Sequence, residues 1–276
     1  MQKKRSYSEL VQRYRHAADS IGASLTTIGE FQTPSGSYEI HQMRLVCGDG
    51  RQRVCISTGM HGNEPGGPEA LIEGLAELGR RRDELNADFL IYPCDNPTGY
   101  ELDLRENWAG LDLNREFARE GQADEIAIVE SSLAGKCFDL TYDLHEDYEM
   151  RGMYLYERAR DGGPPAAESM IAALRAAGYP VHEGDIIDGR PASGGIILPS
   201  GRPPEEDGRF AAGLPKALYM WREGSRHLIT TESPGLLPLG ERVEMQMVCF
   251  NVMLDTLARG CFLPKEADSD TQKDTR

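Results

Sequence analysis

The segment best suited to chemistry runs from Ser57 to Pro65 and reads Ser-Thr-Gly-Met-His-Gly-Asn-Glu-Pro. It places His61 and Glu64 directly after residues 53–58, which predict a central, buried strand. An imidazole nitrogen and a carboxylate oxygen are both good zinc ligands. The glycine and proline residues around them predict a turn, so both side chains can converge on one point.

A third metal ligand is expected at the end of another strand. Residues 138–144 predict that strand, and His145 follows it directly. Ligands of open α/β sheets bind outside the carboxyl ends of the strands, where His145 would meet the turn that carries His61 and Glu64. Two histidines and one glutamate leave a fourth position for water, which is typical of a catalytic zinc site. A lone His-x-x-Glu pair is also typical of surface contacts, so further segments must support the hypothesis.

Glu232 is the candidate for the catalytic base. It follows residues 227–231, which predict a late strand. Zinc lowers the pKa of a bound water, and a neighbouring carboxylate can take that proton and pass it to a leaving amine. The structural alternative is that Glu232 caps the turn that begins at Ser233 and Pro234.

Strands alternate with helices along the chain, and these elements must position the candidate residues. We expect strands at 38–46, 53–58, 88–93, 138–144 and 227–231, and helices at 6–22, 68–80, 123–133, 165–177 and 241–259. This alternation predicts an α/β fold, with helices on both faces of one sheet.

The chain shows no internal repeat and no linker, so residues 1–263 are expected to form a single catalytic domain. Residues 183–215 are rich in glycine and proline, which predicts a functional loop or lid. The polar and charged residues 264–276 are expected to be disordered.

Composition and net charge argue against several classes of function. The 276 residues carry a net charge of −15, which argues against nucleic acid and anionic membrane surfaces as partners. No apolar run approaches the length of a membrane span, and no apolar region follows the basic start, so a secretory signal is not expected. The six cysteines include no Cys-x-x-Cys pair, which favours reduced thiols in a cytoplasmic protein.

Four segments, in order along residues 55–235, resemble the motifs of the zinc carboxypeptidase family. The first is the His61-Gly-Asn-Glu64 zinc motif. The second begins Asn-Pro-Thr-Gly at residue 96 and ends Asp-Leu-Asn-Arg at residue 115. The third is Asp-Leu-His145, and the fourth is Thr-Thr-Glu232-Ser-Pro. One such motif is weak evidence, whereas four in the family order are specific.

The resemblance implies a fold and a set of roles. The fold would be a single domain with a mixed, twisted sheet of about eight strands. One zinc ion per chain would be held by His61, Glu64 and His145. Arg105 would stabilise the oxyanion, and Asn114 and Arg115 would capture a substrate carboxylate. Asp112 would accept a hydrogen bond from His61. A loop tyrosine would contact the substrate, and Tyr219 is the nearest candidate for it.

The lengths of two intervals between these residues indicate which branch of the family the chain resembles. Glu64 and His145 are 81 positions apart, which resembles the compact branches: murein-peptide amidases and the succinylglutamate desuccinylase/aspartoacylase enzymes. Arg105 and Asn114 are nine positions apart, as in the peptidase branch.

The leading hypothesis is therefore a metallocarboxypeptidase-type hydrolase that cleaves an amide bond next to a free carboxylate. An N-acyl amino acid deacylase is the alternative, and a catalytically inactive binding protein is a third. The expected partner is a small peptide or an N-acyl amino acid; the sequence leaves the oligomeric state open. The acidic residues around His145 favour structural ion pairs, with contact to a substrate amine or a second metal near Glu146 and Asp147 as the alternative.

Overall fold

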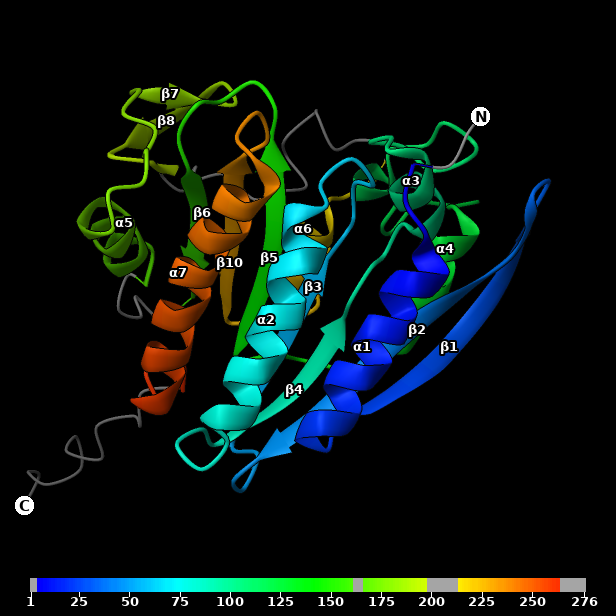
Figure 1. Ribbon diagram of the computed structural model, residues 1–276, viewed down its shortest axis with the longest axis horizontal. Coiled ribbons are helices and arrows are strands. Elements are labelled where there is room, and N and C mark those ends of the chain that lie inside the picture. Colours follow the sequence, from blue (N-terminus) through cyan, green and yellow to red (C-terminus); the bar gives the residue numbers. More distant parts are fainter. Residues whose placement is uncertain (1–3, 161–165, 198–212, 264–276) are drawn as a thin grey trace, which may run out of the picture.

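The computed structural model describes residues 4–160, 166–197 and 213–263 and has the α/β fold that the sequence predicts. One mixed, twisted sheet runs through the molecule (Figure 1). Its strand order is β1-β2-β4-β3-β5-β10-β6-β9-β8-β7. The bounds are β1 Ser24–Thr33, β2 Gly36–Cys47, β3 Gln52–Thr58, β4 Ala87–Tyr92, β5 Leu140–Asp147, β6 Tyr154–Ala159, β7 Ile186–Ile187, β8 Arg190–Ser193, β9 Ile196–Ile197 and β10 His227–Pro234.

The centre of the sheet is parallel: β3 pairs with β4 and β5, and β5 pairs with β10. Parallel strands are covered on both faces, so their side chains are buried on either face of the sheet. In β5, for example, the first seven residues are all buried. The carboxyl ends of these strands lie along one edge of the sheet. His61 and Glu64 follow β3 there, whereas His145 lies within β5, which extends beyond its predicted end.

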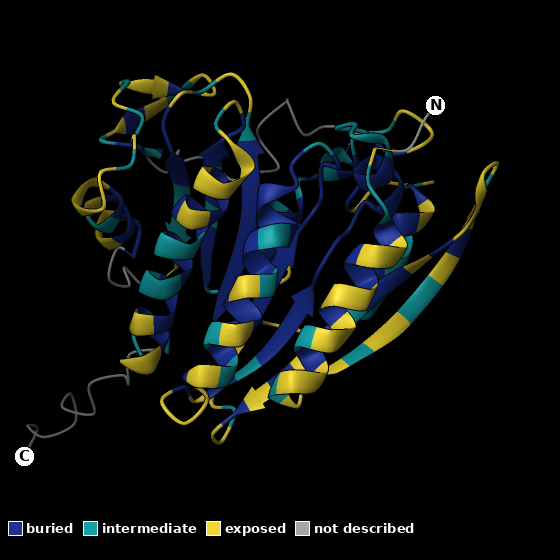
Figure 2. Cartoon of the chain, viewed as in Figure 1, coloured by how far each residue is buried: buried dark blue, intermediate teal, exposed yellow. Residues whose placement is uncertain are grey.

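Two helical layers cover the sheet (Figure 1). The helices α1 (Tyr7–Ile21), α2 (Gly66–Arg80), α7 (Leu239–Ala258) and α5 (Ala166–Ala176) lie side by side on one face. The helices α4 (Asp124–Leu133) and α6 (Lys216–Arg222) lie on the other face, and the short α3 (Pro97–Leu102) follows β4. Figure 2 shows that the central strands and the inward helix faces are buried, whereas the outward helix faces and much of the edge strand β1 are exposed. Within the described residues, no helix has the length and apolar character needed to cross a membrane.

Among the described residues the sheet has ten strands, so the expectation of about eight was too low. The sequence does not predict β1, because this edge strand has one buried residue, Phe31, and shows no clear alternation. Nor does it predict β6. The expected loop at 183–215 is partly wrong, since β7, β8 and β9 extend the sheet within it. Residues 198–212 of that loop and the tail 264–276 lie outside the described residues.

Candidate active site

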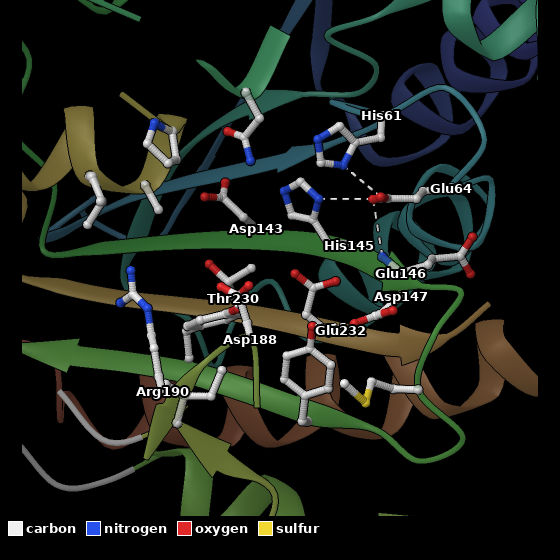
Figure 3. Close-up of a pocket in the computed structure, with 18 of the residues that line it drawn as sticks. His61, Glu64, Asp143, His145, Glu146, Asp147, Asp188, Arg190, Thr230 and Glu232 are labelled. Atoms are coloured by element: carbon white, nitrogen blue, oxygen red, sulfur yellow. Dashed lines mark hydrogen bonds and ion pairs between the residues drawn. The ribbon is translucent and has the colours of Figure 1, made fainter. Parts of the chain in front are cut away.

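The three predicted metal ligands converge (Figure 3). His61 Nδ1 lies 2.6 Å from Glu64 Oε1, and His145 Nδ1 lies 2.9 Å from Glu64 Oε2. One ligand atom from each residue lies within 4.8 Å of the other two, and all three residues are buried. Two imidazole nitrogens and a carboxylate oxygen are a donor set that suits zinc. The side chains present therefore fit a single metal ion.

One close backbone approach and one hydrogen bond to a side chain hold the turn that carries His61 and Glu64. At Gly62, a β-carbon would lie 1.8 Å from the carbonyl carbon of Gly99, so only glycine fits. At the start of α2, the N–H of Gly66 donates to Glu146 Oε2 at 3.0 Å. The turn is thus fixed from both sides.

The neighbouring side chains keep the carboxyl group of Glu64 ionised. Burial raises the pKa of Glu64, but the neighbouring imidazoles of His61 and His145 outweigh burial and hold that pKa well below its usual range. Glu64 is therefore a carboxylate at neutral pH. An ionised carboxylate is the form that binds a metal.

Glu232 lies beside the metal ligands because of strand register. It is the residue opposite His145 in the parallel pair of β5 and β10, and both line a cavity of about 560 Å³. Burial raises the pKa of the Glu232 carboxyl, and the charges of Glu64 and Asp147 raise it further, against the opposing effect of His145. A carboxyl with a raised pKa suits proton transfer near neutral pH.

Asp112 links several of the predicted residues. Its Oδ1 lies 3.3 Å from His61 Nε2 and accepts a hydrogen bond of 3.0 Å from the N–H of Asn114. Its Oδ2 accepts from Arg105 Nε at 3.3 Å and Nη2 at 3.2 Å. The free nitrogen of His61 is thereby fixed, as metal-bound histidines usually require. Arg105 Nη1 lies 3.6 Å from Glu64 Oε1, so the guanidinium borders the metal site.

Asn114 and Arg115 also line the cavity. They belong to the short 3-10 turn Leu113–Arg115, in which Arg115 Nη1 donates to the carbonyl of Asn114 at 2.6 Å. A planar guanidinium beside an amide suits the capture of a carboxylate. Asn114 and Arg115, which are adjacent in the sequence motif, thus lie together on one wall of the cavity.

The position of Tyr219 contradicts the expectation that it contacts the substrate. It lies on α6 but is not among the residues that line the cavity, because its side chain faces the core. The ring is buried against Phe117, with a centroid distance of 5.3 Å. The ring of Tyr219 therefore belongs to the hydrophobic core and not to the wall of the cavity.

The acidic residues after His145 have structural partners. The side chain of Glu146 is completely buried, and its Oε2 lies 2.7 Å from Arg242 Nη1. Asp147 accepts from the hydroxyl of Tyr154 at 2.8 Å. For Glu146, the ion-pair interpretation explains the observed contacts.

A second wall of the cavity was not predicted from the sequence. Tyr154, Tyr156 and Arg158 of β6 and Arg190 of β8 line it. Tyr154, Tyr156 and Arg158 are spaced two residues apart, and this spacing is the sequence signal that their side chains share one face of a strand. Arg190 points into the cavity in Figure 3, but it belongs to a four-residue strand inside the expected loop.

A family model decides the assignment. Residues 50–187, half of the chain, match the model of the succinylglutamate desuccinylase/aspartoacylase catalytic domain. The chain belongs to the succinylglutamate desuccinylase/aspartoacylase family. This assignment confirms the predicted relationship to zinc carboxypeptidases, and the family consists of hydrolases of that superfamily. A search of the curated proteins found no match.

Solved structures share the fold of this family member. A metallopeptidase candidate from Shewanella amazonensis has a TM-score of 0.74 at 22% identity, covering 91% of this chain and 92% of the other. A metallo-carboxypeptidase from Burkholderia cenocepacia has a TM-score of 0.65 at 17% identity, over 90% and 69%. A metallo-carboxypeptidase from Pseudomonas aeruginosa, in complex with (2-guanidinoethylmercapto)succinic acid, has a TM-score of 0.56 at 19% identity, over 89% and 68%.

Proposed function

We propose that this protein is a zinc-dependent hydrolase that cleaves an amide bond next to a free carboxylate. The observation that carries the proposal is the convergence of His61, Glu64 and His145 beside Glu232 in one cavity. Three protein ligands with an open position are typical of catalytic zinc.

Each residue has a role that follows from its chemistry. Bound zinc would lower the pKa of a water and polarise the scissile carbonyl. Glu232 accepts a proton from the attacking water and returns it to the leaving nitrogen. Arg105 stabilises the negative charge that develops on the carbonyl oxygen. Asn114 and Arg115 bind the carboxylate of the substrate and so place the amide bond.

Two substrate classes share this chemistry. A peptidase releases a C-terminal amino acid, whereas a deacylase releases an amino acid from its N-acyl derivative. The likeness to metallo-carboxypeptidases supports the peptidase, and the family match to desuccinylases and aspartoacylases supports the deacylase. The succinic acid derivative bound by the Pseudomonas aeruginosa relative is a small carboxylate ligand, which agrees with either class.

A substrate panel tests the proposal and separates the classes. It contains short peptides, their C-terminal amides, and N-acetyl and N-succinyl amino acids, assayed after chelation and again after zinc is restored. We expect hydrolysis only with zinc and only of substrates with a free carboxylate. Faster turnover of peptides would support the peptidase, and faster turnover of N-acyl amino acids would support the deacylase. Protein that contains no zinc and hydrolyses no member would instead support the catalytically inactive alternative.

A further inference from the structure

Lys216 is a buried lysine next to the cavity but outside its lining. It is 1% exposed and opens α6, directly after Pro215. Its neighbours Pro215 and Ala217 line the cavity, whereas Lys216 does not. A charged lysine is almost never fully buried unless it is paired, so its partners should reveal its role.

The ammonium group of Lys216 is anchored in the sheet. Nζ lies 2.7 Å from Asp95 Oδ2 and 4.2 Å from the centroid of the Tyr92 ring. Asp95 has no exposed surface, and its N–H donates to the carbonyl of Thr58, the last residue of β3. The ion pair therefore ties the start of α6 to the strand edge from which the His61 turn begins.

The backbone of Lys216 holds Asn114. Its N–H donates to Asn114 Oδ1 at 2.9 Å. An amide side chain has one oxygen and one NH₂ group. Because Lys216 engages the oxygen, Asn114 retains its NH₂ group, a donor, for a ligand in the cavity. A substrate carboxylate requires a donor there.

The chain before Lys216 packs closely on the same turn. The N–H of Leu214 donates to the carbonyl of Phe117 at 2.9 Å. At Gly213, a β-carbon would lie 2.1 Å from the carbonyl oxygen of Arg115, so the two backbones are in direct contact. A shift of residues 213–216 would therefore displace both Asn114 and Arg115.

Burial of an ion pair gives little net stability, because desolvation offsets the attraction between the charges. The contacts of Lys216 favour a role for the ion pair in positioning neighbouring residues. We propose that Lys216, through its ion pair with Asp95, is the positioning residue that orients Asn114 and Arg115 toward a substrate carboxylate. The inference rests on the proposed function, in which these two residues bind that carboxylate.

The test compares two probes that differ by one carboxylate: 2-benzylsuccinate and 4-phenylbutanoate. Both can place one carboxylate at the metal, but only 2-benzylsuccinate has a second one for Asn114 and Arg115. Their dissociation constants are measured by calorimetry on zinc-loaded wild type, Lys216→Met, Arg115→Met and Lys136→Met. Lys136 is an exposed lysine that serves as the matched control.

We expect wild type to bind 2-benzylsuccinate more tightly and Arg115→Met to lose the preference. Lys216→Met should weaken 2-benzylsuccinate binding by roughly tenfold or more, because small displacements of positioning groups are costly. Its affinity for 4-phenylbutanoate should change less than about twofold, because that probe does not use the clamp. Lys136→Met should match wild type for both probes.

Two results would overturn the inference in distinguishable ways. A wild type without preference for 2-benzylsuccinate removes the carboxylate clamp of the proposed function, and the inference falls with it. A wild type with the preference and a Lys216→Met variant that keeps it removes the inference alone. If Lys216→Met does not fold, Asp95→Asn/Lys216→Met removes both charges together and is held to the same expectation, with the circular dichroism spectrum as the check on folding.

Discussion

Glu232 and His145 are opposite residues in the parallel pair of β5 and β10. Side chains of opposite residues in neighbouring parallel strands project from the same face of the sheet. Glu232 therefore lies next to a candidate metal ligand because of backbone pairing, without a loop to hold it. This register is the basis of the assignment of Glu232 as the base.

Replacement of Glu232 by glutamine should separate catalysis from metal binding. Glutamine keeps the size of the side chain but cannot accept the proton of water. We expect the turnover number to fall by about three orders of magnitude or more. Zinc content and thermal stability should stay near those of wild type. A variant with a near-native rate would show that another group is the base.

Loss of a metal ligand should abolish the response to zinc. His61→Ala and His145→Ala each remove one of the three converging donors. Wild type should bind one zinc ion per chain and melt at a higher temperature with zinc than without it, because a ligand of the folded state stabilises that state.

Neither variant should show this increase in melting temperature. The control is His16→Ala, since His16 is an exposed histidine on α1. Equal zinc stabilisation of wild type and His145→Ala would contradict the ligand assignment.

Asp112 should tune the affinity for the metal without contact to it. In Asp112→Asn, the carboxylate that faces His61 Nε2 and Arg105 is replaced by an amide. Substitutions of this kind typically weaken metal binding about 10- to 100-fold, and we expect a loss in that range from competition with a chelator. Asp103→Asn, which removes a carboxylate paired with Lys4 and Arg5, is the control. An unchanged zinc affinity in Asp112→Asn would count against its role.

The buried carboxyl of Glu125 should make stability depend on pH. Glu125 is 1% exposed and accepts a hydrogen bond of 3.1 Å from Asn107 Nδ2. Burial raises its pKa above the ordinary value of 4.5. The folded state therefore binds the proton more tightly than the unfolded state does. The contribution of Glu125 to stability is complete below pH 4.5 and is lost as the pH rises through the folded pKa.

Urea unfolding of metal-free wild type and Glu125→Gln across a pH series measures this effect. The free energy of unfolding of wild type, relative to the variant, should be greatest in acid and should decrease toward neutral pH. The exposed Glu120→Gln is the control for removal of one carboxylate. A relative stability that increases with pH would contradict the prediction.

Local sequence patterns predicted the elements that carry the metal ligands. His61 and Glu64 share one turn, and His145 and Glu232 lie in strands that the apolar, aromatic and threonine residues before them indicate. The carboxyl ends of such strands are expected to meet at one sheet edge, whatever the contacts of the rest of the chain. The convergence of the ligands followed from that rule.

Other features depend on contacts between distant residues. Lys216 and Asp95 are 121 positions apart, and neither occurs in a recognisable motif. The distance of Tyr219 from Glu232 along the chain favours a substrate contact, but packing against Phe117 decides where its ring lies. The wall formed by β6 and β8 was missed because short strands with few buried residues give a weak periodic signal.

The metal site is the central claim, and anomalous diffraction from crystals grown with zinc tests it most directly. Data collected on either side of the zinc absorption edge locate the ion independently of any assumption about ligands. We predict one strong peak per chain, in contact with His61 Nδ1, a Glu64 oxygen and His145 Nδ1. A zinc peak elsewhere, with none between these three side chains, would contradict the account.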